Sequence, residues 1–288
     1  MSEKNHSVNG CLVFQSDFGL TDGAVCAMYG VALAVEPSLR LFNLTHDITQ
    51  YNIFEASYRL FQSVEYWAKG TVFVSVVDPG VGSDRKSVVA KTVNGHYIVT
   101  PDNGTLTHIK RFVGIEAVRE IDETRHRRKD TQHSYTFHGR DVYANTGAKL
   151  AAGIIGFDEV GPALTVESLL ELPTGAVTMT NDSVSGCIDI LDIRFGSLWT
   201  NIPREYFEQT GIAFGDEVEV TIQNNGILVY KNRIVYARSF ADVHIGEALV
   251  YTNSLYRMAV AINQGSFARA YSVGTGMHWQ ISFRKVQA

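Results

Sequence analysis

The sequence contains few cysteines and no long apolar run, and both absences narrow the class of protein. Its 288 residues include three cysteines, Cys11, Cys26 and Cys187, which lie far apart in apolar surroundings. A secreted disulfide scaffold would need more of them, so we expect buried, reduced thiols in a cytoplasmic protein. No apolar stretch is long enough to cross a bilayer, and residues 1–6 lack the apolar core of a signal peptide. We therefore expect no membrane association.

An excess of charge is also missing. The net charge is −5 at pH 7, which provides no general surface for nucleic acid or membrane. The exception is a compact basic run at residues 125–129, Arg-His-Arg-Arg-Lys. Because no aromatic side chains interleave it to stack on bases, we expect a solvated surface loop there. The sequence thus predicts no nucleic-acid partner.

Motifs that hold cofactors or metals are absent as well. No phosphate-binding Gly-x-x-x-x-Gly-Lys-Ser loop occurs, and Gly80-Val81-Gly82 lacks the third glycine and the helix opening of a dinucleotide site. No His-x-x-x-His or Asp-x-Asp pair brings two ligands onto one ion. We predict neither a cofactor nor a metal. Side chains of metal-binding types nevertheless occur at Asp17, His46, Asp47, Asp78, Asp102 and His138.

The pattern of apolar residues changes part-way along the chain. The first half alternates strand-like and helix-like segments, which predicts a mixed sheet flanked by helices. The second half is made of short β-rich segments bounded by turn residues, which predicts a small barrel or closed sandwich. We place the α/β domain at residues 1–175 and the β-barrel domain at 182–288. The expected elements are strands 11–14, 39–44, 71–77, 88–92, 97–100, 187–193, 217–222, 227–231, 234–237, 248–252, 258–262 and 280–283 and helices 24–35, 53–67, 141–152 and 205–210.

Three turns in the first half combine acids, glycines and bases directly after or beside apolar runs. Because ligands bind at the carboxyl ends of strands in open α/β sheets, these turns predict an active site. Asp17 is placed to accept hydrogen bonds from ribose hydroxyls, whereas Asp22 is better explained as a helix cap. Arg85 is close enough to fold back on Asp78, either to orient a water or only to stabilise the loop. His138 is either a third catalytic group or a satisfied structural histidine.

One segment of the second half is also distinctive. Phe195 to Asn201 places two aromatic side chains around a glycine and small polar residues. These side chains either stack on a purine and bond its edge or form a barrel corner with core aromatics. Phe240, residues 253–254 and residues 263–265 are further candidates for a pocket wall.

Taken together, these segments resemble the S-adenosyl-L-methionine (SAM) hydroxide adenosyltransferase family, the SAM hydrolases, and also the related SAM-dependent fluorinases and chlorinases. The resemblance covers nearly the whole chain, and five motifs in the same order are far more specific than any one alone. The motifs are Ser16-Asp17-Phe18-Gly19, Asp78-Pro79-Gly80-Val81-Gly82 with Arg85, Pro101-Asp102-Asn103-Gly104, Phe137-His138-Gly139-Arg140-Asp141, and Phe195-Gly196-Ser197 followed by Trp199-Thr200-Asn201.

The resemblance implies an activity and an assembly. It implies hydrolysis of SAM to adenosine and L-methionine by in-line attack of water or hydroxide at the ribose C5′, with Asp78, Arg85 and His138 as the catalytic set. No metal is required, because the sulfonium loses its charge on leaving. It also implies a homotrimer whose ligand lies between the N-terminal domain of one subunit and the C-terminal domain of the next. The substrate-binding residues would be Asp17, Tyr51, Phe195, Ser197, Phe240, Ser254 and Asn263.

The chain departs from the halogenating branch at several positions. Those enzymes carry Tyr and Ser where this chain has His138 and Gly139, and Tyr in place of Asp78. The serine contacts their halide, so its absence favours water as the nucleophile. Tyr51 replaces a Trp, and their halide-binding insertion is missing. Three alternatives stay open: a regulatory protein that retains adenosine or SAM with little turnover, a halide-using SAM transferase, and a metal-dependent hydrolase.

Overall fold

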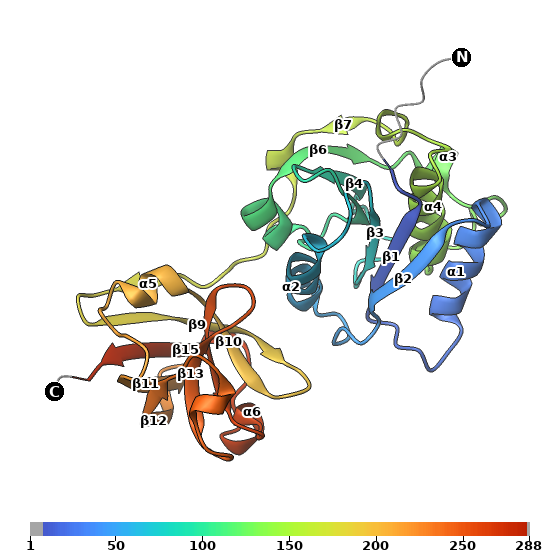
Figure 1. Cartoon of the computed structure of the whole chain (residues 1–288). Coiled ribbons are helices and arrows are strands. Elements are labelled where there is room, and N and C mark those ends of the chain that lie inside the picture. The colour runs from blue at the N-terminus through green and yellow to red at the C-terminus, as the bar shows by residue number, and fades with distance from the viewer. Residues whose placement is uncertain (1–7, 287–288) are drawn as a thin grey trace. The chain divides into compact units, whose positions relative to one another are not determined.

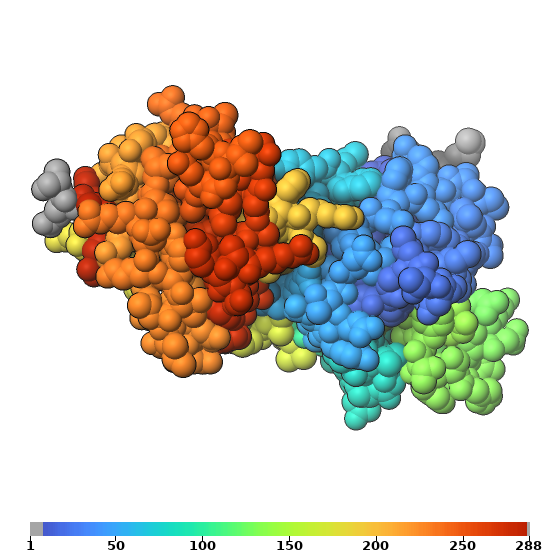
Figure 2. Space-filling view, turned by 90° about the horizontal axis from the view of Figure 1, so that it is seen from below, coloured from blue at the N-terminus to red at the C-terminus, as the bar shows by residue number. Residues whose placement is uncertain are grey.

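The structure, a computed structural model, describes residues 8–286, so the expectation for residues 1–6 lies outside the described part of the chain. The chain splits into two compact units, Met1–Leu172 and Pro173–Ala288. Each unit has its own apolar core. Figure 2 shows each as a densely filled body, coloured blue to yellow-green in the first unit and mainly orange to red in the second.

A seven-stranded mixed sheet forms the centre of the first unit, in the order β2-β1-β3-β5-β4-β6-β7. The strands β2, β1, β3 and β5 are parallel to one another, and β4, β6 and β7 continue the sheet with antiparallel pairs. This confirms the predicted mixed sheet. The strands are β1 (Cys11–Ser16), β2 (Arg40–Thr45), β3 (Val72–Val76), β4 (Ser87–Thr92), β5 (Tyr97–Pro101), β6 (Ile115–Glu120) and β7 (Ala163–Leu164).

Helices cover both faces of this sheet, as Figure 1 shows. The helices α1 (Ala24–Val35) and α4 (Asn145–Ala151) pack on one face through a core that includes Leu12, Phe14 and Val74. On the other face, α2 (Ile53–Val64) and the π-helical turn η1 (Ile109–Val113) pack on Val13 and Phe73. The remaining helical segments are α3 (Glu123–His126), the π-helical η2 (Gly139–Ala144) and the 3-10 turns η3 (Phe157–Glu159) and η4 (Val166–Ser168).

Local sequence explains why these elements begin and end where they do. Every residue of β3 is buried, which suits an apolar, β-branched strand in the middle of a parallel sheet. Helix α2 begins where the Asn52 side chain accepts a hydrogen bond from the Glu55 backbone N–H at 3.0 Å. Its apolar residues Ala56, Leu60 and Val64 recur every four positions and are buried. The helix ends at Val64, three residues before the predicted end.

The second unit is a closed barrel, which confirms the predicted fold class. Seven strands pair in the order β10-β14-β13-β12-β11-β15-β9, and β9 pairs again with β10 to close the ring. The short strand β8 (Thr178–Met179) adds to β9. The other strands are β9 (Ser183–Asp192), β10 (Ser197–Pro203), β11 (Glu217–Asn224), β12 (Ile227–Tyr236), β13 (Ala248–Thr252), β14 (Arg257–Ile262) and β15 (Gly276–Lys285), with helical segments α5 (Arg204–Glu208), η5 (Phe240–Asp242) and α6 (Phe267–Ala270).

Two further observations concern the burial of the cysteines and the length of the helices. Cys11 and Cys187 are buried, but Cys26 is exposed, so the expectation of three buried thiols is wrong for Cys26. Its neighbours on α1, Val25 and Met28, take the inward positions of the helix and leave Cys26 outside. Within residues 8–286, no helix combines the length and apolarity needed to cross a membrane.

Candidate active site

The polar turns predicted in the first half meet at one edge of the seven-stranded sheet. Asp17 directly follows β1, Asp78 follows β3 after one residue, and His138 directly precedes η2. All three line one hollow of about 290 Å³, together with Tyr51 and Phe137. The site therefore lies at the carboxyl ends of two neighbouring parallel strands, where open α/β sheets bind ligands.

The acid of this site is held in a paired and nearly buried arrangement. Arg85 Nε donates to Asp78 Oδ1 at 2.7 Å, and Arg85 Nη2 donates to Asp78 Oδ2. The side chains of Asp78 and Arg85 are 6% and 9% exposed. Burial alone would lower the pKa of Arg85, but the hydrogen-bonded Asp78 and the nearby Tyr143 and Glu123 outweigh it and raise that pKa. Arg85 is thus a permanent cation that fixes the plane of the Asp78 carboxylate.

The loop after β3 sets the direction of Asp78. The Val81 backbone N–H donates to the Asp78 carbonyl at 3.2 Å, and the Ser83 N–H donates to the Gly80 carbonyl at 3.0 Å. Gly82 has φ +80°, and a Cβ there would lie 2.9 Å from the Tyr135 carbonyl oxygen. Only glycine fits this close approach at positive φ, so the Asp78 loop packs against the segment that leads to His138.

His138 is buried beside two arginines. Its Nδ1 lies 3.1 Å from Arg85 Nη2, and its Nε2 lies 2.6 Å from Arg127 Nη2. Burial lowers the pKa of His138, and Arg127 and Arg85 lower it further, against the opposing effects of Glu123 and Asp78. The imidazole is therefore neutral at pH 7.

The glycine after His138 has a packing role. A Cβ on Gly139 would lie 3.2 Å from Val76 Cγ1 and 3.3 Å from the Phe18 ring. This proximity lets the start of η2 pack directly against the end of β3. The Phe18 ring in turn meets Phe137 edge-on, with ring centroids 5.9 Å apart. The His138 turn is thus fixed by apolar packing as well as by polar contacts.

Asp17 and Tyr51 also line the hollow and contact each other. Asp17 Oδ2 accepts a hydrogen bond from the Tyr51 backbone N–H at 2.9 Å. Tyr51 has φ 65°, a left-handed conformation that a non-glycine residue seldom adopts, and its side chain is 70% exposed. Asp22, which the sequence assigned to capping, accepts from the Ala24 N–H at the start of α1 at 2.8 Å and also lines the hollow.

A buried polar network supports the Asp17 turn from below. Ser16 Oγ lies 2.7 Å from His46 Nδ1, and His46 Nε2 lies 3.0 Å from Asn43 Oδ1. The His46 carbonyl also accepts from the Gly19 N–H at 2.8 Å. Burial lowers the pKa of His46 to about 4. His46 is therefore a neutral histidine that ties the end of β2 to the turn after β1.

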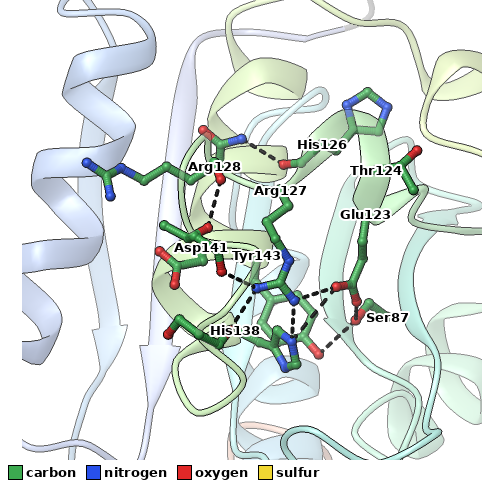
Figure 3. A network of polar contacts seen from close by, with 12 residues as sticks. Ser87, Glu123, Thr124, His126, Arg127, Arg128, His138, Asp141 and Tyr143 are labelled. Carbon is green, nitrogen blue, oxygen red and sulfur yellow. Dashed lines mark hydrogen bonds and ion pairs between the residues drawn. The ribbon is translucent and has the colours of Figure 1, made fainter.

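Four polar residues next to the site were not predicted from the sequence. They are Ser87, Glu123, Arg127 and Tyr143. Figure 3 shows the side chains of Glu123, Arg127 and His138 directed toward one another, with Ser87 and Tyr143 beside them. Arg127 Nη2 donates to Glu123 Oε2 at 2.7 Å, and Ser87 Oγ donates to Glu123 Oε1 at 3.0 Å. Tyr143 Oη lies 3.2 Å from Ser87 Oγ.

The expectation of a solvated loop at residues 125–129 is therefore wrong in part. Arg125, Arg128 and Lys129 are exposed. His126 is buried and contacts the Glu159 carbonyl oxygen at 2.9 Å, and the Arg127 side chain is 12% exposed. The reason is helix α3, which starts at the Asp122 cap and ends at His126, so that His126 is buried and Arg127 follows as the C-cap residue.

The predicted residues of the second half line a separate hollow of about 880 Å³ on the barrel unit. Phe195, Ser197, Phe240, Ser254 and Asn263 all contribute to it, with Trp199 and Tyr251. The ring centroids of Phe240 and Tyr251 lie 5.1 Å apart, and Trp199 Nε1 donates to Tyr251 Oη at 3.1 Å. Residues 195–201 form a corner of the barrel, because the chain turns at Gly196 with φ +68° and β10 follows directly. The same segment also forms part of the wall of this hollow.

In residues 8–286, no group of three or more His, Cys, Asp or Glu side chains is arranged to hold a metal ion.

Comparison with known proteins places this geometry in a family. The family model described as the SAM hydroxide adenosyltransferase N-terminal domain matches residues 12–161, and the model of the C-terminal domain matches residues 186–280. The chain belongs to the SAM hydroxide adenosyltransferase family. The resemblance in the sequence motifs is thereby confirmed.

Individual members of the SAM hydroxide adenosyltransferase family and its relatives agree with this assignment. The chain is 33% identical to an (R)-S-adenosyl-L-methionine hydrolase of Methanocaldococcus jannaschii, over 75% of each chain. It is 27% identical to a fluorinase of an Actinoplanes species, over 93% of this chain and 96% of that one. A crystal structure of an uncharacterized conserved protein from Thermotoga maritima superposes with a TM-score of 0.86 at 32% identity, covering 95% of this chain and all of that one.

Proposed function

We propose that this chain hydrolyses SAM at the ribose C5′ and releases adenosine and L-methionine. The observation that carries the proposal is the Asp78 carboxylate, which Arg85 fixes at the wall of the N-terminal hollow beside a neutral His138. A carboxylate held this way keeps lone pairs on both oxygens that can accept hydrogen bonds from a water and orient it. Membership of the SAM hydroxide adenosyltransferase family supplies the substrate class.

The charge of the hollow suits a sulfonium cation. Asp17, Asp22 and Asp78 line it, and the described lining includes no Lys or Arg side chain. Carboxylates within a partly desolvated hollow attract a cation more strongly than they would in water. Asp17 would take the ribose hydroxyls, and the side chain of Tyr51 would close one side.

The reaction balances without a cofactor. As the water oxygen bonds to C5′, the C5′–S bond breaks and its electron pair returns to sulfur, so methionine leaves as a neutral thioether. The water proton passes to Asp78 or to solvent. Because the leaving group loses a charge, no cation is needed to stabilise it, and we expect turnover in the presence of a chelator. The M. jannaschii relative is named for the R sulfonium, and we propose the same epimer here.

We also propose a cytoplasmic homotrimer in which each site combines two subunits. The residues assigned to the reacting end and to the ribose hydroxyls lie on the first unit, and those assigned to the rest of the nucleoside and to methionine lie on the barrel. Each hollow alone is thus half a site. From the family resemblance we infer that the partner hollow lies on a neighbouring subunit, and the free cysteines suit a reducing compartment.

The first test of the proposal removes the charge of Asp78. We expect Asp78→Asn to lower kcat by roughly 10²- to 10⁴-fold, because the isosteric amide cannot accept a proton or orient water as the carboxylate does. Purified protein is incubated with SAM in chloride-free buffer containing EDTA, and adenosine and methionine are quantified by liquid chromatography and mass spectrometry. Asp84→Asn is the matched control, because Asp84 is exposed in the same loop.

Other outcomes distinguish the alternatives. A bound nucleoside released only on denaturation, with no turnover above Asp78→Asn, would identify a binding protein instead. Formation of a 5′-halogenated nucleoside when chloride or fluoride is added would identify a halide-using transferase. Activity that EDTA abolishes and a divalent ion restores would identify a metal-dependent enzyme.

A further inference from the structure

His138 faces two guanidinium groups, but its ring can accept a hydrogen bond from only one of them. A neutral imidazole has one N–H and one nitrogen with a lone pair. Arg127 Nη2 lies 2.6 Å from Nε2, and Arg85 Nη2 lies 3.1 Å from Nδ1. One of these arginines therefore donates to the ring, and the nitrogen facing the other carries the proton.

The charged side chains around the ring already balance one another, so a third cation would have no counter-charge. Asp78 and Glu123 balance Arg85 and Arg127, and the four side chains reach His138 from the ends of β3, β4 and α3. Tyr143 of η2 completes the surroundings, and burial raises the pKa of its hydroxyl so that it stays neutral. A protonated His138 would add an uncompensated buried charge. The question for His138 is thus which neutral tautomer it adopts.

Arg127 is the better placed donor of the two. One N–H of its Nη2 is directed to Glu123 Oε2 at 2.7 Å, which leaves the second for His138 Nε2. Its Nη1 donates to the Ser134 carbonyl at 3.0 Å, in the turn before His138. Glu123 is itself fixed by Ser87. An Nε2–H would meet Arg127 donor to donor at 2.6 Å, a far worse contact than an Nδ1–H at 3.1 Å from Arg85.

We propose that Arg127, held by Glu123, is a positioning residue that fixes His138 as the tautomer with its proton on Nδ1. In that tautomer the N–H is directed to the side of the ring where Asp78 and Arg85 lie. His138 then serves as a neutral hydrogen-bond donor to an oxygen at the hollow, and it does not serve as a general base. The tautomer stands on the geometry alone, while its use in catalysis rests on the proposed hydrolysis.

The tautomer can be measured without any turnover. Protein labelled with ¹⁵N-histidine is examined by long-range ¹H–¹⁵N NMR, in which the ring-nitrogen shifts identify the protonated nitrogen, and His138→Gln assigns the signal. We expect Nδ1–H in the wild type and a switch to Nε2–H in Arg127→Gln, where Arg85 is the remaining guanidinium in contact with the ring. Arg128→Gln, a change at an exposed arginine of the same run, should leave the signal as it is. An Nε2–H wild type, or an Arg127→Gln protein that keeps Nδ1–H, would overturn the proposal.

Kinetics provide the second readout. In Arg127→Gln we expect kcat to fall by roughly 10- to 100-fold with little change in KM, because the donor is misplaced while the substrate contacts remain. The acid limb of the kcat/KM profile should move to higher pH, since the ring loses a cationic neighbour and keeps Glu123. If Arg127→Gln does not fold, Glu123→Gln, whose amide oxygen can still accept from Arg127, replaces it. We expect a smaller fall in kcat, and the acid limb should move to lower pH because the ring loses an anionic neighbour. An unchanged pH profile in a folded variant would contradict the role, whereas absence of hydrolysis in the wild type would refute the proposed function and leave the NMR result standing.

Discussion

At the scale of single residues, the molecule buries neutral histidines next to its site, and this makes its stability depend on pH. His46 is 3% exposed, and burial lowers its pKa from 6.5 to about 4. As pH falls below 6.5, the unfolded chain binds a proton before the folded one does. The contribution of His46 to the free energy of unfolding must therefore decrease as pH falls from 6.5 to 4. Well above pH 6.5, His46 is neutral in both states and this contribution is fully present.

The His46 contribution can be isolated with a substitution. Urea unfolding of the wild type and of His46→Gln is compared at pH 7 and pH 5. The pH-dependent loss should be smaller in the variant by about 2 kcal/mol, because glutamine does not titrate. His96, His126 and His138 also have lowered pKa values, and they contribute equally to both proteins. His244→Gln, at an exposed position, should lose as much as the wild type. Equal losses in His46→Gln and the wild type would refute this account.

Sequence patterns predicted some of the polar residues at the candidate site and not others. Asp78, Arg85 and His138 stand in short turns whose spacing marks them. Arg127 stands in a run of five similar residues, and nothing in that run tells which side chain points inward. The distinction comes from α3, which ends at His126 and has Arg127 as its C-cap, and whose four residues are too few for a periodic signal in the sequence. Ser87 contacts Glu123 from a segment 36 residues away, a tertiary contact that no local pattern predicts.

At the scale of elements, the close fit of α4 on the sheet leads to a second stability prediction. A Cβ on Gly147 of α4 would lie 2.5 Å from Val74 Cγ2 and 3.3 Å from Leu12 Cδ1. We expect Gly147→Ala to lower the free energy of unfolding by roughly 1–3 kcal/mol through overpacking. The matched control is Gly30→Ala in α1, where a Cβ meets open space. That change should raise the free energy by roughly 0.5–1 kcal/mol.

Denaturant unfolding of the two glycine variants at pH 7 checks the pair. If the two variants change the free energy of unfolding with opposite signs, the close approach of α4 to β3 depends on the absence of a side chain at Gly147. A Gly147→Ala protein as stable as Gly30→Ala would mean that the helix moves away from the sheet at no cost, and would contradict the packing described here.

The pattern of apolar residues predicted an element well where that element is fully buried or buried along one face. The continuous apolar run of β3 predicted a central strand, and the helix over residues 24–35 coincides with α1. β12 was divided in two in the prediction, because Asn232 and Arg233 interrupt its apolar residues, yet they are exposed within one strand. The prediction has no strand over β10, because the aromatic and polar residues at its start resemble a binding segment. In the structure these residues form the strand and also line the barrel hollow.

At the scale of the whole molecule, the proposed division of the site between subunits predicts complementation. Asp78→Asn inactivates the N-terminal half, and a double variant, Phe195→Ala with Phe240→Ala, inactivates the barrel half. If the two are unfolded together and reassembled as trimers of 31.9 kDa chains, about a quarter of the sites should combine two intact halves. Activity should return toward that fraction of the wild type. Light scattering that gives a monomer, or mixtures that stay inactive, would place both halves of the site in one chain.

The measurement that tests the central claim most directly is the fate of the water oxygen. Wild-type protein is incubated with SAM in ¹⁸O-labelled water, and both products are analysed by mass spectrometry. Hydrolysis at C5′ predicts adenosine that carries the label at its 5′ hydroxyl and methionine that carries none. Label in homoserine together with methylthioadenosine, or adenosine formed without label, would contradict attack of water at C5′.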